Sequence, residues 1–196
     1  LQAVFVFYSS MRPKFTLKIK WEVVLETARL SIPRTLALSI VSFVSFFFVA
    51  LAAKFSAGSI AIFNLSFNLQ SVPLSLIGVS FSLAAFPSLA ISFAKKDMTE
   101  VVNKISEGLG QIIFWSLPVT ALIIVLRAHI VRVVLGSGNF DWSATRLVAA
   151  SLALFVTSAV FQGIQLFLSR SHYALGKTKW PLFGNILGGL VSVLTA

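Results

Sequence analysis

Long uncharged apolar stretches alternate with short polar connections along this chain. Five stretches approach the length of about 20 residues that a helix needs to cross a hydrocarbon core of about 30 Å. They predict membrane-spanning helices over about residues 36–53, 59–94, 100–126, 143–169 and 181–196. The pattern therefore predicts an all-α protein, built as a polytopic transmembrane helical bundle.

The first part of the chain has a different pattern. Residues 1–11 are predicted to be the end of a preceding transmembrane helix, and residues 12–34 a basic, amphipathic cytoplasmic linker before the bundle of residues 35–196. Within the linker, Leu17 to Leu30 has one apolar helical face. Such a helix either lies in the membrane interface or packs on the bundle as a soluble linker. Because both ends of the chain fall inside apolar stretches, we expect it to be a piece of a larger protein.

Composition and charge agree with a membrane protein. Of the 196 residues, 57% are hydrophobic and only 11% are charged, and the mean hydropathy is +0.93. The net charge of +10 comes from clusters between apolar stretches, which is typical of flanks that meet anionic lipid headgroups and not of a nucleic-acid-binding face. The side predicted to be cytoplasmic carries Arg12, Lys14, Lys18, Lys20, Arg29, Arg34, Lys95, Lys96, Lys104, Arg170, Lys177 and Lys179, against Lys54, Arg127, Arg132 and Arg146 on the other.

Residues that commonly carry catalysis or bind metals are scarce in this sequence. There is no cysteine, and neither His129 nor His172 has a second metal-ligating residue three or four positions later. The uncharged runs on which the spans are based, residues 36–53, 71–94, 108–126, 147–169 and 181–196, contain no acidic residue, which removes paired carboxylates. Gly176, Lys177 and Thr178 resemble part of a phosphate-binding loop, but Ser171 stands where that motif needs glycine. We therefore expect a protein that is not an enzyme and has no cofactor and no metal site.

Polar and small residues recur at helical spacing within two spans. One stripe contains Asn64, Asn68, Ser71, Ser75, Gly78 and Ser82, and the other Thr35, Ser39, Ser42 and Ser45. At these steps of three and four, each stripe is expected on one helical face that avoids lipid. Such a face either packs closely against another helix or lines a water-filled substrate cavity. The two amides favour the cavity, because an amide has more hydrogen-bonding capacity than serine or glycine.

Arg34 follows Pro33 at the predicted cytoplasmic end of the first complete span. Its guanidinium group is suited to bidentate binding of a phosphate. Alternatively, the side chain is an anchor that extends from the helix end to the membrane surface.

Several short motifs along the chain resemble one known family in order and spacing. They are Ile32–Leu36, Ala57–Ile60, Gln70–Leu74 with Gly78–Val79, Phe86–Leu89, Leu117–Pro118, Leu135–Phe140 and Tyr173–Thr178. Together they resemble the MurJ/MviN lipid II flippases of the MOP superfamily. The resemblance implies a piece of a two-lobed, fourteen-helix transporter, from the end of the sixth helix into the eleventh.

The same resemblance implies a function in the bacterial cytoplasmic membrane. Members of this family move a lipid-linked peptidoglycan precursor, lipid II, across that membrane by alternating access. The implied substrate carries a pyrophosphate on an undecaprenyl lipid, and Arg34, Asn64, Asn68 and Gln70 are the residues expected to line its route. Membrane lipids and cell-wall synthesis proteins are the further partners expected, and no nucleic acid is.

The sequence departs from the family pattern at two places. Phe67 and Asn68 stand where the family commonly has an Asp-Arg pair, and Phe48 stands where many members have an acidic or amide residue. An asparagine still donates hydrogen bonds to a phosphate but does not neutralise its charge. Two alternatives therefore stay open: an exporter of another polyprenyl-linked glycan, and a membrane scaffold for cell-wall synthesis that transports nothing.

Overall fold

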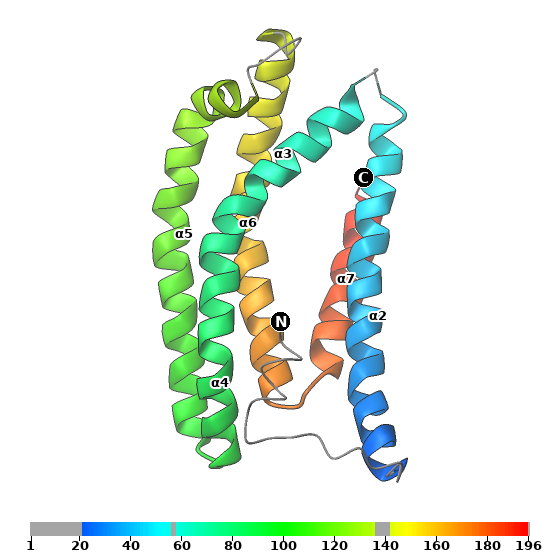
Figure 1. The fold of residues 1–196 in the computed structure, drawn as a ribbon, viewed down its shortest axis with the longest axis vertical. Helices are drawn as coiled ribbons and strands as arrows, with labels where there is room; N and C mark the ends of the chain where they lie inside the picture. Colours follow the sequence, from blue (N-terminus) through cyan, green and yellow to red (C-terminus); the bar gives the residue numbers. More distant parts are fainter. Residues whose placement is uncertain (1–20, 56–57, 136–141, 196) are drawn as a thin grey trace, which may run out of the picture. The chain divides into compact units, whose positions relative to one another are not determined.

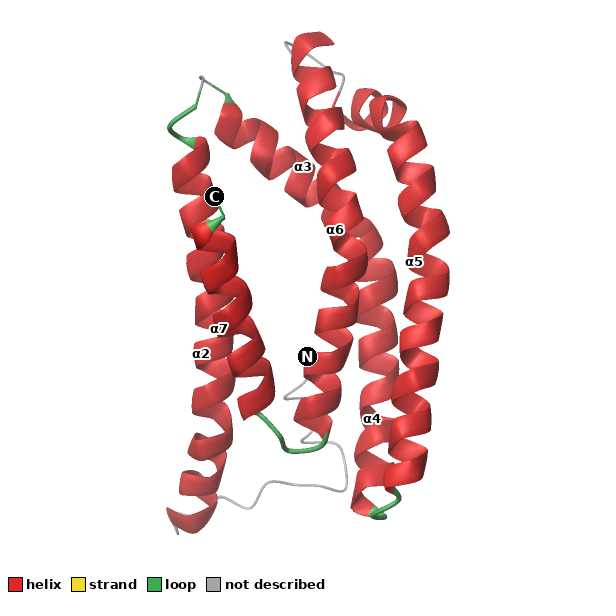
Figure 2. Cartoon of the chain, turned by 180° about the vertical axis from the view of Figure 1, so that it is seen from behind, coloured by secondary structure: helices red, strands yellow, loops and turns green. Residues whose placement is uncertain are grey.

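The computed structural model describes residues 21–55, 58–135 and 142–195, apart from a few side chains in the first helix. The described elements, in chain order, are α2 (Trp21–Ala52), α3 (Ser59–Pro73), η1 (Leu74–Val79), α4 (Ser80–Ala94), α5 (Met98–Leu135), α6 (Trp142–Ala174) and α7 (Lys179–Leu194). All are helices, and no strand occurs in these ranges (Figures 1 and 2). The predicted all-α class is therefore confirmed. The terminal helix expected over residues 1–11 lies outside the described residues.

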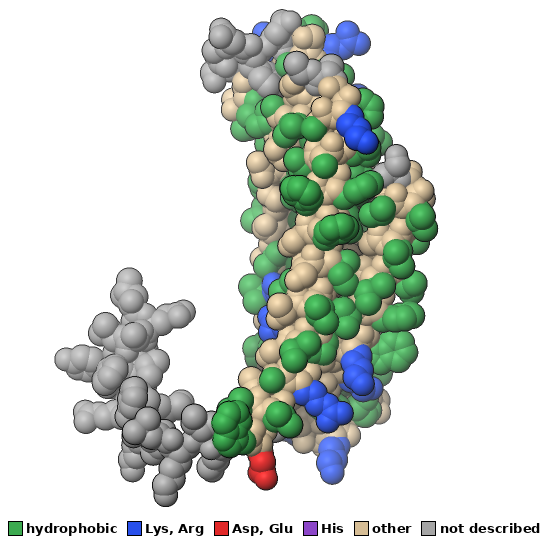
Figure 3. All heavy atoms as spheres, turned by 90° about the vertical axis from the view of Figure 1, so that its right-hand side faces the viewer, with side chains coloured by type: hydrophobic (Ala, Val, Ile, Leu, Met, Phe, Trp, Pro, Cys, Tyr) green, Lys and Arg blue, Asp and Glu red, His purple; other side chains and the backbone are tan. Residues whose placement is uncertain are grey.

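Four helices within the described ranges are long and apolar enough to cross a membrane. They cover Thr27–Ala52, Ser59–Ala94, Met98–Leu135 and Trp142–Ala174, while the 16 residues of α7 form a shorter apolar helix. On the face seen in Figure 3, hydrophobic side chains cover much of the middle of the helices, and Lys and Arg side chains lie mostly toward the ends. This distribution fits helices whose middle parts contact lipid and whose ends contact headgroups.

The chain divides into two units, residues 1–32 and residues 33–196. The described part of the first unit is the beginning of α2, where the sequence indicated a separate linker. Helix α2 continues without a break through Pro33 to Ala52. Because proline has no N–H group, it cannot donate a hydrogen bond to the carbonyl of Arg29. The helix nevertheless continues on both sides of Pro33.

Within the second unit, α6 has the largest buried surface. Ten of its residues are buried, and they contact α3, η1, α4 and α5. One core cluster joins α5 to α6 through Val131, Val148, Ala149, Leu152 and Val156. A second cluster contains Ile77, Ile112 and Phe167, and the Phe167 ring packs directly against Gly108 on α5. The helix with the most buried residues therefore comes from a stretch with little polar–apolar alternation, as expected for a helix that contacts several others.

A π-helical segment, η1, interrupts the long helix of residues 59–94. Before it, the buried residues are Ser66, Gln70 and Pro73. After it, Ser82, Leu89 and Ser92 are buried, together with Ile77 and Gly78 inside the segment itself. Each residue of an α-helix turns the chain by about 100°. A π-turn absorbs one extra residue, so the set of residues that faces the core shifts by one position, or about that angle, from α3 to α4.

The change of face brings two backbones together. A Cβ atom placed on Gly78 would lie only 2.9 Å from the Cα atom of Gly163 on α6. The Ser82 hydroxyl turns back to the carbonyl of Gly78 and so needs no partner on α6. The prediction of a single polar face from Asn64 to Ser82 is therefore wrong, because η1 turns the second half of the stripe into the interface with α6.

Candidate functional site

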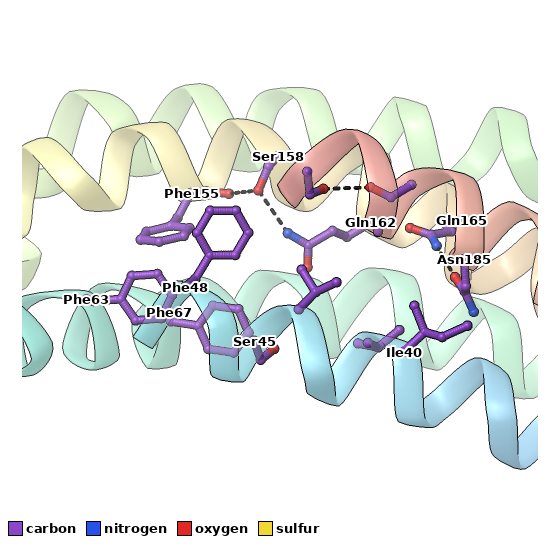
Figure 4. Close-up of a pocket in the computed structure, with 15 residues that line it drawn as sticks. Ile40, Ser45, Phe48, Phe63, Phe67, Phe155, Ser158, Gln162, Gln165 and Asn185 are labelled. Carbon is purple, nitrogen blue, oxygen red and sulfur yellow. Dashed lines mark hydrogen bonds between the residues drawn. The ribbon is translucent and has the colours of Figure 1, made fainter. Parts of the chain in front are cut away.

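A cavity of about 470 Å³ opens between α2, α3, α6 and α7 within residues 33–196 (Figure 4). Helices α2 and α7 contact each other beside it, since a Cβ on Gly189 would lie 3.1 Å from an Ile40 methyl group and 3.2 Å from one of Val44. The lining is contributed by Ile40, Val41, Val44, Ser45, Phe48, Phe63, Phe67, Phe155, Ser158, Gln162, Gln165, Asn185, Gly188, Gly189 and Ser192. Its size is in the range typical of small-molecule sites.

Amide side chains from α6 and α7 form the polar part of this cavity. The Gln165 amide donates a hydrogen bond of 2.7 Å to the Asn185 side-chain oxygen, which joins the two helices. The Gln162 amide donates to the Ser158 hydroxyl at 2.8 Å, and that hydroxyl donates to the Phe155 carbonyl. Each primary amide has two donor hydrogens and an acceptor oxygen, so these bonds use only part of their capacity. The remaining groups are available to water or to a polar ligand in the cavity.

Aromatic rings form the other part of the cavity. The Phe155 ring meets Phe63 edge-on at 5.3 Å and Phe67 at 6.1 Å, and Phe63 and Phe67 stack at 6.2 Å. Figure 4 shows these rings and Phe48 at one end and the Gln165–Asn185 pair at the other. The cavity is therefore amphipathic along its length.

A second, more open groove of about 940 Å³ shares Phe48, Phe63, Phe155 and Ser158 with this cavity. It extends along α2, α3 and α6 toward Phe55 and Leu147, and its other lining residues are mainly apolar. The two spaces together offer an apolar channel that leads to an amide-lined end. Such a surface suits an amphipathic molecule better than an ion or a uniformly polar one.

The structure separates the four residues that the sequence analysis placed on the substrate route. Asn64 and Asn68 are exposed on α3, and neither lines the cavity, whose α3 wall is formed by Phe63 and Phe67. Gln70 is only 1% exposed, and neither its side-chain oxygen nor its nitrogen has a hydrogen-bond partner. Arg34 is exposed near the start of the unit, with its guanidinium carbon 5.3 Å from the centre of the Tyr173 ring.

The amides that do line the cavity were missed in the sequence. Gln162, Gln165 and Asn185 each stand in an apolar stretch that was considered only as a span. Their signal was available, because a primary amide inside a membrane helix is costly unless it has a partner. What the sequence could not show is that residues 20 positions apart would meet across α6 and α7. Among the described residues, no three His, Asp or Glu side chains come together as metal ligands.

Comparison with known proteins places the chain in a family. The model of the family described as "Lipid II flippase MurJ" matches residues 1–196. Similar curated proteins include the probable lipid II flippase MurJ of Thermotoga maritima, 26% identical over 74% of this chain and 30% of that protein. Those of Rhizobium tropici and Bdellovibrio bacteriovorus are 27% and 24% identical over 64% and 77% of this chain, and 24% and 29% of their own lengths.

The chain spans less than a third of the length of these curated relatives. No solved structure matches it. The family match nevertheless covers every residue of the chain, and the described helices are long and apolar enough for a multi-pass protein of the cytoplasmic membrane. From its helices and from this match over its whole length, the chain belongs to the MurJ lipid II flippase family.

Proposed function

We propose that the chain forms part of a flippase that moves lipid II, an undecaprenyl-pyrophosphate glycan, across the cytoplasmic membrane by alternating access. The observation that carries this proposal is the match of the lipid II flippase family to all 196 residues. The proposed activity breaks no covalent bond, so it requires a path for the substrate through the protein and no catalytic residues. The same proposal includes cell-wall synthesis proteins as binding partners of the flippase.

The exposed amides of α3 support a polar route. Asn64 and Asn68 lie on a helix that is long and apolar enough to cross the membrane, and their side chains are uncovered. An amide that faces acyl chains loses its hydrogen bonds, so this face is better suited to water or to another part of a transporter. We therefore keep Asn64 and Asn68 as substrate-route residues, with Arg34 at the cytoplasmic end.

Gln70 belongs to the proposed route in another way. Its amide is buried beside η1 with no partner, so it cannot contact a substrate without a movement of the surrounding helices. A transporter that alternates between two states exposes different residues in each. In this proposal, Gln70 contacts the substrate only in the state that opens the α3–α6 contact.

A genetic rescue experiment tests the proposal. The gene that encodes this chain is expressed in bacteria depleted of their own lipid II flippase, and growth and lipid II translocation are measured. We expect rescue by the natural sequence and a fall of about tenfold in translocation with Asn68→Leu or Arg34→Ala, the scale of one lost hydrogen bond to a charged group. Asn103→Leu, an exposed asparagine on α5, is the matched control and should rescue fully.

The outcomes separate the alternatives. Normal insertion without rescue would contradict a lipid II flippase. The alternative function, an exporter of another polyprenyl-linked glycan, is supported by Asn68, which stands where the family commonly has arginine. A neutral amide suits a less charged substrate than an arginine does. That alternative predicts translocation of another polyprenyl-linked glycan in proteoliposomes, with no movement of lipid II.

A further inference from the structure

An arginine of α2 packs on a tyrosine ring of α6 where α6 approaches its end, and a second arginine stands three residues earlier on α6. The Arg34 guanidinium carbon lies over the Tyr173 ring, 5.3 Å from its centre. Arg170 precedes Tyr173 by three residues, so the two side chains lie on the same side of α6. Arg34, Arg170 and Tyr173 all belong to the unit of residues 33–196.

One nitrogen of the Arg170 guanidinium group lacks a hydrogen-bond acceptor. Its Nη1 nitrogen is buried and has no partner in the structure. A buried polar group left without a partner costs about 1–3 kcal/mol, and more when it is charged.

No carboxylate of the described residues forms an ion pair with Arg34 or Arg170. The sequence contains no Asp or Glu from residue 33 to 96 or from residue 142 to 196, so the acidic residues of the second unit's described part are Asp97, Glu100 and Glu107, at or on α5. The ion pair there joins the Lys104 Nζ atom to Glu100 Oε1 at 2.7 Å. The Arg34 and Arg170 side chains are therefore two positive charges without a carboxylate partner in the described structure.

We propose that Arg34 and Arg170 bind the phosphate of a lipid headgroup beside Tyr173. A guanidinium group offers paired N–H donors that match two phosphate oxygens. The cation–π contact with the Tyr173 ring uses the positive charge of Arg34 and none of its N–H donors, which stay available to an anion. Lys177 and Lys179, both exposed just after α6, add positive charge along the approach from the membrane surface.

Two lipids carry this chemistry. One is the pyrophosphate of a prenyl-linked glycan, and this source rests on the proposed function. The other is the phosphate of an ordinary bilayer phospholipid, which requires no transport activity. The phosphate site itself stands on the geometry of Arg34, Arg170 and Tyr173, whichever lipid fills it.

A binding experiment on the purified gene product in detergent micelles tests the site. Farnesyl pyrophosphate and a short-chain phosphatidylglycerol are titrated in separate arms, with farnesol and a short-chain diacylglycerol as the matching ligands without phosphate. We expect Arg170→Gln and Arg34→Gln each to weaken binding of at least one phosphate ligand by about tenfold. The phosphate-free ligands should bind more weakly and should not distinguish the variants from the natural sequence.

Arg132 offers a matched control. Its guanidinium carbon lies 5.2 Å from the Trp142 ring, so it repeats the arginine-on-aromatic arrangement at the other end of the helices. Arg132→Gln removes the same charge and the same ring contact, and it should change the affinity less than twofold. Elution volume and thermal unfolding identify any variant that fails to fold, and Arg34→Gln, at an exposed position, keeps the test decisive if Arg170→Gln does not fold.

The results assign the source as well as the site. Loss confined to the farnesyl pyrophosphate arm supports a substrate headgroup, loss confined to phosphatidylglycerol supports a structural phospholipid, and loss in both supports a general phosphate site. Equal affinity of folded Arg34→Gln and Arg170→Gln for both phosphate ligands would overturn the proposal, as would an equal loss with Arg132→Gln. Because binding is measured without transport, a failed rescue in cells would contradict the proposed function and leave this site standing.

Discussion

The two halves of the helix from Ser59 to Ala94 use the same kind of residue for different purposes. Before η1, Asn64, Asn68 and Ser71 are exposed. Gly78 within η1 and Ser82 after it are buried, although a regular helix would place them on the same face as Asn64. The comparison shows that the two interpretations of the stripe, close packing and a polar surface, each describe one half. The π-turn between the halves determines which stripe residues are exposed and which pack against α6.

Insertion of a second extra residue into η1 is the strongest way to break this difference. The π-turn already absorbs one extra residue, so an alanine inserted after Ser75, which is exposed, should rotate α4 by about 100° relative to α3. The buried face of α4 would then turn away from α5 and α6, and we expect a loss of more than about 4 kcal/mol in the free energy of unfolding. Unfolding in mixed micelles measures the loss.

An insertion elsewhere controls for the lengthening itself. Lys54 is exposed in the connection between α2 and α3, and an alanine inserted after it should cost far less because connections absorb length changes. If the insertion after Ser75 were as stable as the insertion after Lys54, the alignment of α3 and α4 across η1 would not set the buried face of α4.

Gly78→Ala tests the close contact made by the second half. The new Cβ would lie 2.9 Å from the Gly163 Cα atom, a backbone atom that cannot move aside as a side chain can. We expect a loss of about 1–3 kcal/mol, the usual cost of overpacking. Gly163→Ala is the paired variant, since its nearest contact is an ordinary 3.5 Å, and it should cost less.

A baseline for these two variants comes from α7. Gly184→Ala has nothing within 4 Å of its Cβ, so it should raise stability by up to about 1 kcal/mol through helix propensity. Equal unfolding free energies for all three alanine variants would show that the two backbones are not in contact in the folded protein.

Gln70→Leu probes the end of the first half with the smallest expected change. Gln70 is buried in the last turns of α3, and both polar atoms of its side chain lack partners. Replacing it with leucine of similar size removes this penalty, so we expect a gain of about 1 kcal/mol in the free energy of unfolding. A loss of stability would instead mean that the amide has a partner, such as a bound water. The same variant should lower translocation if Gln70 reaches the substrate in another state.

The site was harder to predict than the fold class. The apolar stretches and the family motifs were sufficient for an all-α membrane protein of this family, because span length and residue type are local properties of the sequence. The cavity was not predicted, since the Gln165–Asn185 bond and the contact of Phe155 with Phe63 and Phe67 join different helices. Arg34 was expected at the end of a span, whereas the structure places it inside α2, and its contact with Tyr173 on α6 was not predicted.

The sequence by itself determined the apolar helices, the net positive charge and the family, because each follows from residue type and from which residues stand within a few positions of one another. Only the tertiary structure decided which side of each helix is buried. A single π-turn shifts by about 100° which residues face the core, without changing the order of residues, and the close approach of Gly78 to Gly163 on α6 is a contact between segments far apart in the sequence.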